Sequence, residues 1–221
     1  IGAEEEKGNA LVKESLIDDR FLAAAKEVKN FAPQFHLSLQ SGSDRVLRSM
    51  NRHYTRAEYL GKCEKIRSVF PDAAITTDII AGFPTETEED FLDSLRIIEE
   101  AGFAQIHAFP YSPREGTNAY KKYKELPFSV KKERVERLLE KGAEEKKKYI
   151  SGFVGRMLTV VSETFSDGYT EGYSENYIRL YIPGKLPKRS TRVCVERLFK
   201  DGALATEAPE EPEGGTVDAE K

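Results

Sequence analysis

Residues 35–40 alternate between apolar and polar side chains, with the odd-numbered positions apolar and the even-numbered positions polar. This period of two predicts a strand with one buried face. The SGSD stretch that follows turns the chain, and Ser43 or Asp44 can cap the next helix. The polar side chains therefore converge at the C-terminal end of the strand, where free helix N–H groups can bind an anion or a carboxylate. The pattern predicts a ligand-binding site.

The same reasoning extends over the next hundred residues. Thr55 and Glu58 form a capping-box pattern, and Gly102 ends a helical stretch. Helical periodicity predicts helices over 16–29, 56–70, 89–101 and 129–149, and β-rich runs predict strands over 74–81 and 104–111. Strands alternating with helices predict an α/β domain with three parallel strands and flanking helices. Three strands do not close a barrel, so either the sheet is small and open or further strands belong to a missing N-terminal part.

After Gly152 the pattern changes to short strands at close spacing, which predicts a small all-β barrel. These strands are expected at 157–161, 169–173, 177–182 and 191–198. The tyrosines and basic residues of this barrel could stack on bases and bind phosphates of a nucleic acid. Alternatively, the tyrosines form the core of the barrel and the charged side chains face solvent. The densest basic stretch contains Lys185, Lys188, Arg189 and Arg192. The predicted organisation is a loosely ordered segment 1–15, an α/β part 16–150, the β-module 151–206 and a disordered acidic tail 207–221.

The composition adds few constraints. The chain has 221 residues, of which 39% are hydrophobic and 33% charged, with a formal net charge of −4. The tail 207–221 has six acidic residues and one Lys, a net charge of −5, so the remainder stands at +1 and neither demands nor forbids a nucleic-acid partner. No apolar run is long enough for a membrane span and no secretory signal is seen, so we expect no membrane partner. The two cysteines, Cys63 and Cys194, are far apart in the sequence, which predicts a protein located in the reducing cytoplasm. The first residue is Ile, which suggests a fragment.

Polar side chains on the predicted strands form the candidate chemistry. If the strands belong to a barrel, its interior receives His36, Ser38, Gln40, Thr76, Asp78 and His107. Such a set suits a polar cofactor, but it is also what an internal hydrogen-bond network needs, and for the two histidines we prefer the network. The two histidines and Asp78 could also bind a metal, although nothing in their spacing specifies one. Gly82 is interpreted as a place where a ligand approaches the backbone.

Three stretches then carry a family resemblance: HLSLQSGSDRVLRSMNRHYT at 36–55, TTDIIAGFPTETEEDF at 76–91 and HAFPYSPREGT at 107–117. They resemble the radical S-adenosylmethionine methylthiotransferases, and GYTEGYSENYIRLYI at 168–182 is similar to their RNA-binding TRAM domain. The resemblance implies part of a radical S-adenosylmethionine barrel followed by an OB-like TRAM barrel. It also implies S-adenosylmethionine and [4Fe-4S] clusters as cofactors, tRNA as the partner, and insertion of a methylthio group at an unactivated C–H bond.

The cluster-binding cysteines of that family have no counterpart in this sequence. The family motif CxxxCxxC is absent, and a [4Fe-4S] cluster needs three or four thiolates. We therefore expect this chain to bind no cluster and to be inactive alone, with the N-terminal cluster-binding part of the same protein as a missing partner. A free-standing RNA-binding protein is the alternative. A hydrolase using His36, Asp78 and His107 is disfavoured, because no nucleophile or activating pair accompanies them.

The resemblance also assigns residues and a substrate. The quoted motifs look most like the branch that modifies C2 of N6-threonylcarbamoyl-adenosine in tRNA, with the isopentenyl-adenosine tRNA branch and the ribosomal-protein aspartate branch as alternatives. By resemblance, S-adenosylmethionine is surrounded by Gln40, Ser41, Arg52, Asp78, Gly82, Phe109 and Tyr111. In this assignment Arg52 binds the methionyl carboxylate, since a guanidinium can hold a carboxylate with two parallel hydrogen bonds. The aromatic pair supports the adenine.

Overall fold

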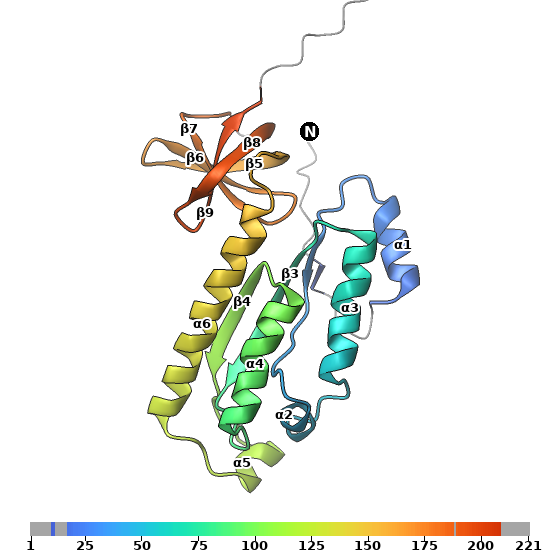
Figure 1. The fold of residues 1–221 in the computed structure, drawn as a ribbon, viewed down its shortest axis with the longest axis vertical. Coiled ribbons are helices and arrows are strands. Elements are labelled where there is room, and N and C mark those ends of the chain that lie inside the picture. Colours follow the sequence, from blue (N-terminus) through green and yellow to red (C-terminus); the bar gives the residue numbers. More distant parts are fainter. Residues whose placement is uncertain (1–9, 12–16, 188, 209–221) are drawn as a thin grey trace, which may run out of the picture. The chain divides into compact units, whose positions relative to one another are not determined.

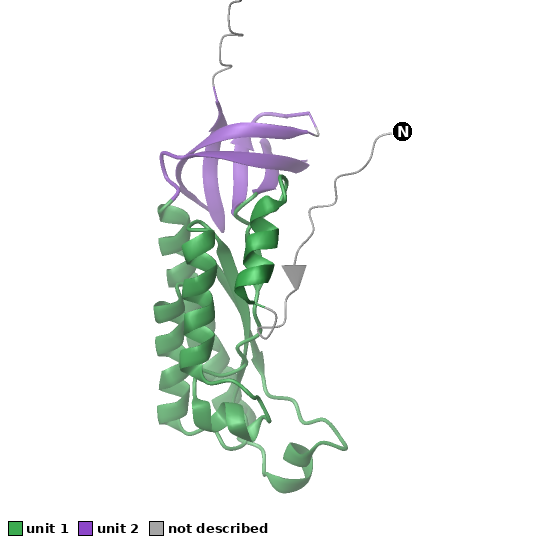
Figure 2. Cartoon of the chain, turned by 90° about the vertical axis from the view of Figure 1, so that its right-hand side faces the viewer, with its two compact units in different colours: residues 1–152, 175–177 green, residues 153–174, 178–221 purple. Residues whose placement is uncertain are grey.

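A computed structural model describes residues 10–11, 17–187 and 189–208 of the chain. The chain divides into two compact units, which Figure 2 shows in different colours. Unit 1 comprises residues 1–152 and 175–177, and unit 2 comprises residues 153–174 and 178–221.

Unit 1 contains a parallel sheet with the strand order β1-β2-β3-β4. The strands are β1 (Ala10–Leu11), β2 (Gln34–His36), β3 (Ala74–Ala81) and β4 (Gln105–Pro110). The two later strands confirm the sequence prediction. The first predicted strand is shorter than expected, although Gln40 rejoins β3 through an isolated parallel bridge to Ile79. The prediction of three strands was wrong, because β1 falls in the segment expected to be loosely ordered and is too short to show any alternation.

Six helices accompany this sheet in the described residues. They are α1 (Asp19–Glu27), α2 (Asp44–Ser49), α3 (Arg56–Val69), α4 (Glu88–Ala101), α5 (Asn118–Lys122) and α6 (Phe128–Ser151). The predicted caps are present: Ser43 accepts from Val46 N–H, Thr55 and Glu58 form a capping box, and Gly102 ends α4 in the left-handed conformation. The short helix α5 was not predicted. In the part of the chain that the structure describes, no helix is long and apolar enough to cross a membrane.

The main core lies between the sheet and its helices, with α3, α4 and α6 along one face of the strands (Figure 1). The apolar positions of the first predicted strand, Phe35, Leu37 and Leu39, are fully buried there together with Ile75 and Ile79 of β3. Burying each such side chain contributes about 1.5–3 kcal/mol. The alternate positions of the same strands face the other side of the sheet. The predicted division into an apolar and a polar face is therefore correct.

Unit 2 is a closed five-stranded barrel with the order β5-β6-β7-β9-β8. The strands are β5 (Met157–Ser166), β6 (Tyr169–Ser174), β7 (Arg179–Pro183), β8 (Ser190–Phe199) and β9 (Gly202–Glu207). All neighbouring pairs are antiparallel except β7 and β9. The barrel agrees with the expected small all-β module. The sequence did not predict β9, which includes Glu207, the first residue assigned to the acidic tail. Residues 209–221 of that tail lie outside the described residues.

The packing of α6 against β4 depends on a glycine. A Cβ atom added at Gly142 would lie 2.4 Å from Cγ1 of buried Ile106. We expect Gly142→Ala to lower the free energy of unfolding by about 1–3 kcal/mol, as overpacking does elsewhere. Gly61→Ala on α3 is the matched control, because nothing lies within 4 Å of its added Cβ and alanine favours a helix by about 1 kcal/mol. Urea unfolding measures both variants, and equal stabilisation of the two would contradict the prediction.

Candidate functional site

A cavity of about 1400 Å³ opens at the C-terminal ends of β3 and β4. Its walls come from Gln40, from the end of α2, from the two strand ends and from the loop that contains α5. Among the residues predicted to bind a cofactor, Gln40, Arg52, Asp78, Phe109 and Tyr111 line this cavity. The carboxyl ends of parallel strands meet at one edge of a sheet, which is where ligands bind in α/β proteins.

Gln40 reaches the cavity through an unusual backbone conformation. Its φ of 69° lies in the left-handed region, which is costly for a residue other than glycine. Three hydrogen bonds hold it in place. Gln40 N–H donates to the Asp78 carbonyl (2.8 Å), and the Gln40 carbonyl accepts from Ile80 N–H (2.9 Å). The Tyr54 hydroxyl donates to the preceding carbonyl, that of Leu39 (2.8 Å).

Arg52 is placed by the way in which α2 ends. Asn51 has a φ of 59°, and its N–H donates to the Arg48 carbonyl (3.0 Å). The next residue, Arg52, donates its N–H back to the Leu47 carbonyl (2.9 Å). These two bonds with a left-handed residue after the helix define a Schellman motif. The motif turns the chain sharply, so that residues 48–52 together line the cavity.

Asp78 belongs to a hydrogen-bond network on the polar face of the sheet. Its Oδ2 lies 3.1 Å from His36 Nε2 and accepts from the Ser38 hydroxyl at 3.0 Å. The other ring nitrogen of His36 lies 3.0 Å from Thr76 Oγ1. The internal network preferred for His36 is therefore present, and the ring of His107 lies 6.2 Å from that of His36. No three His, Cys, Asp or Glu side chains of the described residues are grouped so that they could hold a metal ion.

Two of the predicted cofactor residues, Ser41 and Gly82, are not among the described residues that line the cavity. Ser41 is fully buried, and its hydroxyl accepts from Ser43 N–H (3.3 Å). Gly82 has a φ of 73°, and its N–H donates to Glu86 Oε2 (2.7 Å). A Cβ atom at Gly82 would lie 2.5 Å from Cγ of Lys131. The close approach that this glycine permits is therefore that of the Lys131 side chain.

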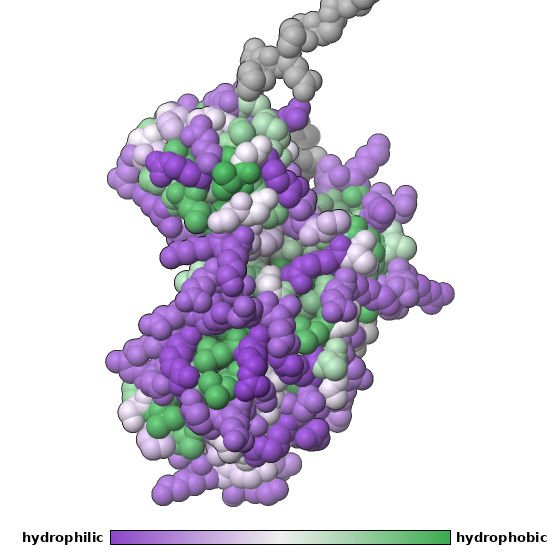
Figure 3. All heavy atoms as spheres, viewed as in Figure 1, coloured by the Kyte–Doolittle hydropathy of each residue, from purple (hydrophilic) through white to green (hydrophobic). Residues whose placement is uncertain are grey.

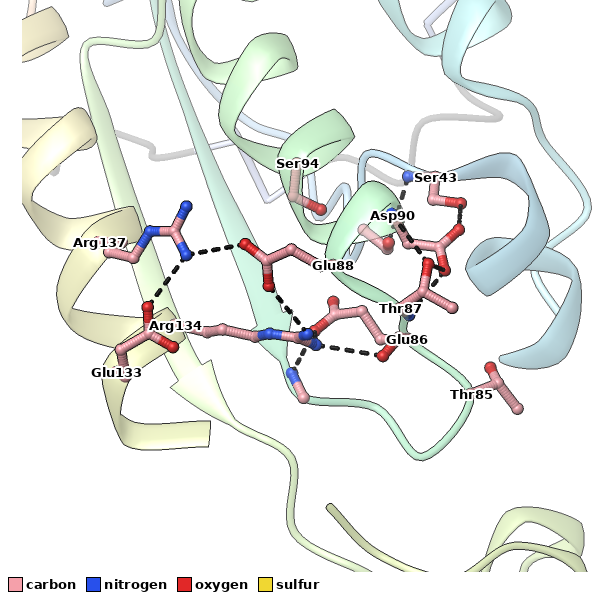
Figure 4. Close-up of polar contacts among 12 residues, drawn as sticks. Ser43, Thr85, Glu86, Thr87, Glu88, Asp90, Ser94, Glu133, Arg134 and Arg137 are labelled. Atoms are coloured by element: carbon pink, nitrogen blue, oxygen red, sulfur yellow. Dashed lines mark hydrogen bonds and ion pairs between the residues drawn. The ribbon is translucent and has the colours of Figure 1, made fainter. Parts of the chain in front are cut away.

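Behind the cavity, the loop after β3 is held by charged side chains (Figure 4). The buried pair of Glu86 and Arg134 has an O–N distance of 2.6 Å, and Arg134 also contacts Glu88 at 3.2 Å. Burial raises the pKa of Glu86, and the hydrogen bonds from Gly82 and Arg134 partly offset this rise. The sequence analysis missed this pair, because its members lie 48 residues apart and no local pattern connects them.

A second carboxylate, Asp90, ties the start of α4 to α2. It accepts hydrogen bonds from the Ser43 hydroxyl (2.6 Å), from Thr87 N–H (2.8 Å) and from the guanidinium of Arg45. Burial by itself would raise the pKa of Asp90, but these hydrogen bonds outweigh it and hold the pKa well below the usual range.

The cysteines of the described residues do not fit a [4Fe-4S] cluster. Cys63 is buried on α3, where burial raises the pKa of its thiol to about 12. Cys194 lies on β8 of the other unit. A cluster needs three or four thiolates in one place, and a thiol with a raised pKa is a poor ligand.

The barrel presents the predicted basic residues in and beside the loop between β7 and β8. Lys185, Arg189 and Arg192 are exposed, whereas Lys188 lies outside the described residues. Thr170 anchors the loop, since its hydroxyl donates to the Gly184 carbonyl (2.7 Å) and accepts from Leu186 N–H (2.9 Å).

For one tyrosine of the barrel, the structure favours a role in the core over base stacking. Tyr181 is 2% exposed, and its hydroxyl donates to Asp201. Burial and this hydrogen bond raise its pKa to about 12.

Comparisons with known proteins agree with this geometry. Residues 9–98 match the sequence model of the Radical SAM superfamily. The solved structure of coproporphyrinogen III oxidase from Escherichia coli, described as a radical SAM enzyme, covers 85% of this chain and 45% of its own, with a TM-score of 0.51. At 14% identity this likeness shows the fold alone. The likeness in fold and the match to the sequence model together support the partial α/β radical SAM domain expected from the sequence.

Curated relatives are considerably more similar in sequence. The tRNA-2-methylthio-N(6)-dimethylallyladenosine synthases of Thermobifida fusca and Thermus thermophilus are each 48% identical over 143 residues, which is 65% of this chain. That of Streptomyces coelicolor is 52% identical over 121 residues, or 55% of the chain. The chain spans 29%, 31% and 24% of the length of these three relatives. The matches support the methylthiotransferase family.

The hydrogen bonds of Asp90 predict a pH-dependent contribution to stability. We expect Asp90→Asn to lower the free energy of unfolding at pH 7 by about 1.5–3 kcal/mol, the range for hydrogen bonds to a charged group. The folded pKa is lowered, so this contribution is full above the unfolded value near 4 and is lost as the pH falls toward the folded pKa. Urea unfolding at pH 7, 5 and 3 measures it, with the half-exposed Asp93→Asn as control. A difference between Asp90→Asn and wild type that does not change with pH would contradict the prediction.

Proposed function

We propose that this chain supplies the S-adenosylmethionine cavity and an RNA-binding barrel of a radical S-adenosylmethionine tRNA methylthiotransferase. The observation that carries the proposal is the convergence of Gln40, Arg52 and Asp78 on one cavity at the strand ends. These residues come from two separate motifs of the family resemblance. The high identity to tRNA methylthiotransferases supports the same conclusion. A cytoplasmic location fits an enzyme acting on tRNA.

Individual residues of the cavity suit separate groups of S-adenosylmethionine. In our proposal the guanidinium of Arg52 binds the methionyl carboxylate, and the Gln40 amide and the Asp78 carboxylate bind polar groups beside it. Phe109, which is 51% exposed, and Tyr111 offer ring surface to the adenine. S-adenosylmethionine, when bound, would supply the methyl group and, after one-electron reduction by a cluster held in another part of the protein, the adenosyl radical. The described residues do not fit a cluster, so we propose that this chain is inactive by itself and orients the cofactor next to another part of the protein.

The proposed substrate is an N6-modified adenosine in tRNA, modified at C2. Two N6 side chains are candidates. The motifs quoted above resemble the threonylcarbamoyl branch, whereas the names of the relatives refer to dimethylallyladenosine. Dimethylallyl is another name for isopentenyl. The names of the relatives therefore favour the isopentenyl-adenosine tRNA branch, which the sequence analysis treated as an alternative.

Deletion of the gene that encodes this chain tests the function and identifies the branch. We expect tRNA from the deletion strain to lose one 2-methylthio nucleoside and to accumulate its precursor. Mass spectrometry of digested tRNA then distinguishes N6-threonylcarbamoyl-adenosine from N6-dimethylallyl-adenosine as that precursor. Re-introducing the intact gene is the control. Unchanged 2-methylthio nucleosides would contradict a tRNA methylthiotransferase and leave the free-standing RNA-binding protein or the ribosomal-protein aspartate branch.

For the barrel, we propose a TRAM-like role in which Lys185, Lys188, Arg189 and Arg192 contact tRNA phosphates. Thr170 holds the loop, so its exposed cations project from a fixed base. Phosphate contacts give affinity without sequence preference and make it dependent on salt.

We expect Lys188→Ala with Arg189→Ala to weaken binding of labelled tRNA. Losing two phosphate contacts should reduce the slope of log K against log salt by about 1.5 to 2. A variant with Lys26→Ala and Lys29→Ala removes the same charge from the exposed surface of unit 1 and serves as control. Fluorescence anisotropy titrations at several salt concentrations measure both slopes. Equal slopes for the two double variants would contradict the prediction. The loop between β7 and β8 would then be a solvent-exposed hairpin end that does not bind tRNA.

A further inference from the structure

The cavity is lined by far more positive than negative charge. Its described lining contains five cations, Arg48, Arg52, Arg114, Lys121 and Lys122, and a single carboxylate, that of Asp78. All five cations are exposed. Within the described part of the chain, no carboxylate forms an ion pair with any of them, whereas Asp78 is already bonded to His36 and Ser38. Such an excess of unpaired charge favours anionic groups of a ligand.

The five cations fall into two groups. Arg48 lies in the last turn of α2 and Arg52 just after it, and Arg52 is the residue proposed to bind the methionyl carboxylate of S-adenosylmethionine. Arg114, Lys121 and Lys122 belong to the loop and helix α5 on the other wall, and we call them the α5 cluster. The volume of about 1400 Å³ exceeds the 300–1000 Å³ of a usual small-molecule pocket. The cavity therefore has room for a second ligand beside the cofactor.

The α5 cluster rests on an anchored wall. Tyr111 and Tyr123, which flank the loop, both pack edge-on against buried Phe83, with ring centroids 5.1 Å and 6.3 Å away. Lys122 Nζ lies 5.1 Å from the centre of the Tyr123 ring. These aromatic contacts hold α5 in place. Its exposed cations therefore lose less conformational entropy when they bind a ligand.

We propose that Arg114, Lys121 and Lys122 bind backbone phosphates of the RNA strand that brings the target base into the cavity. This inference rests on the proposed function and adds a contact surface in unit 1, separate from the basic loop of the barrel. Long flexible cations at the mouth of a cavity suit phosphates, because these contacts position a strand without reading its sequence. Tyr123, which also lines the cavity, offers ring surface on which a base can stack.

The test compares two triple variants of the full chain that lose the same charge. One is Arg114→Ala with Lys121→Ala and Lys122→Ala. The control is Arg20→Ala with Lys26→Ala and Lys29→Ala, three exposed residues on or next to α1, at the other end of unit 1 (Figure 1). The probe is a labelled anticodon stem-loop RNA with an unmodified adenosine, which carries no anion except its phosphates. A second probe carries threonylcarbamoyl-adenosine, whose side chain adds a carboxylate.

We expect the α5 variant to reduce the slope of log K against log salt by about 2, at 0.7 per single-stranded phosphate contact. If the variant and the wild type bind equally at 1 M salt, this change in slope makes the variant bind on the order of 100-fold more weakly than the wild type at 0.1 M. The loss should be equal for both probes. Equal binding by the two triple variants would overturn the inference. A loss confined to the threonylcarbamoyl probe would also overturn it, because the cluster would then bind the side-chain carboxylate. The outcome of the gene deletion is independent, so failure here is distinguishable from failure of the proposed enzyme activity.

Discussion

The buried ion pair between Arg134 and Glu86 is the interaction on which the rest of unit 1 depends. Both residues are about 95% buried, and Glu86 Oε2 accepts from Arg134 and from Gly82 N–H at once. Removing one member of such a pair leaves an uncompensated charge in the interior, at a cost of about 3–5 kcal/mol. On the face of unit 1 that Figure 3 shows, hydrophilic side chains surround a hydrophobic patch. The pair itself is buried and joins α6 to the loop that follows β3. It therefore holds in place the loop after β3, which contributes Phe83 to the wall of the cavity.

From this pair, packing extends along the chain to α5. Lys131, one turn before Arg134, passes over Gly82 and donates from Nζ to the Tyr111 carbonyl (3.1 Å). The residue after Gly82 is Phe83, which supports both Tyr111 and Tyr123. A single helix, α6, thus holds the end of β3, the end of β4 and the start of the wall that carries α5. The exposed cations of that wall owe their position to contacts that are themselves buried.

The sequence predicted the parts of the fold that local patterns encode. Strand alternation placed Gln40 and Asp78 on the polar side of their strands, and both line the cavity. Thr55 and Thr87 cap their helices through side chains within three residues. What it could not predict depends on distant contacts or on very short elements. β1 is only two residues long, α5 lies in a loop rich in Pro and Gly, and Glu86 finds its partner 48 residues away. Gly82 was assigned to a ligand because a glycine reports a close approach without identifying the neighbour, which is Lys131.

Five described residues other than glycine have a left-handed backbone, and two of them line the cavity, whereas Asp167, Tyr177 and Lys200 do not. Gln40 and Asn51 both have left-handed backbones, and both line the cavity. Asn adopts this conformation easily, but glutamine lacks the short side chain that makes it favourable, so Gln40 costs about 1–2 kcal/mol. Glycine at position 40 would relieve the strain and keep both hydrogen bonds to β3. A fold selected for stability alone would therefore favour glycine there. The side-chain amide is the only polar group that glycine would remove, so the strain points to a function for that amide inside the cavity.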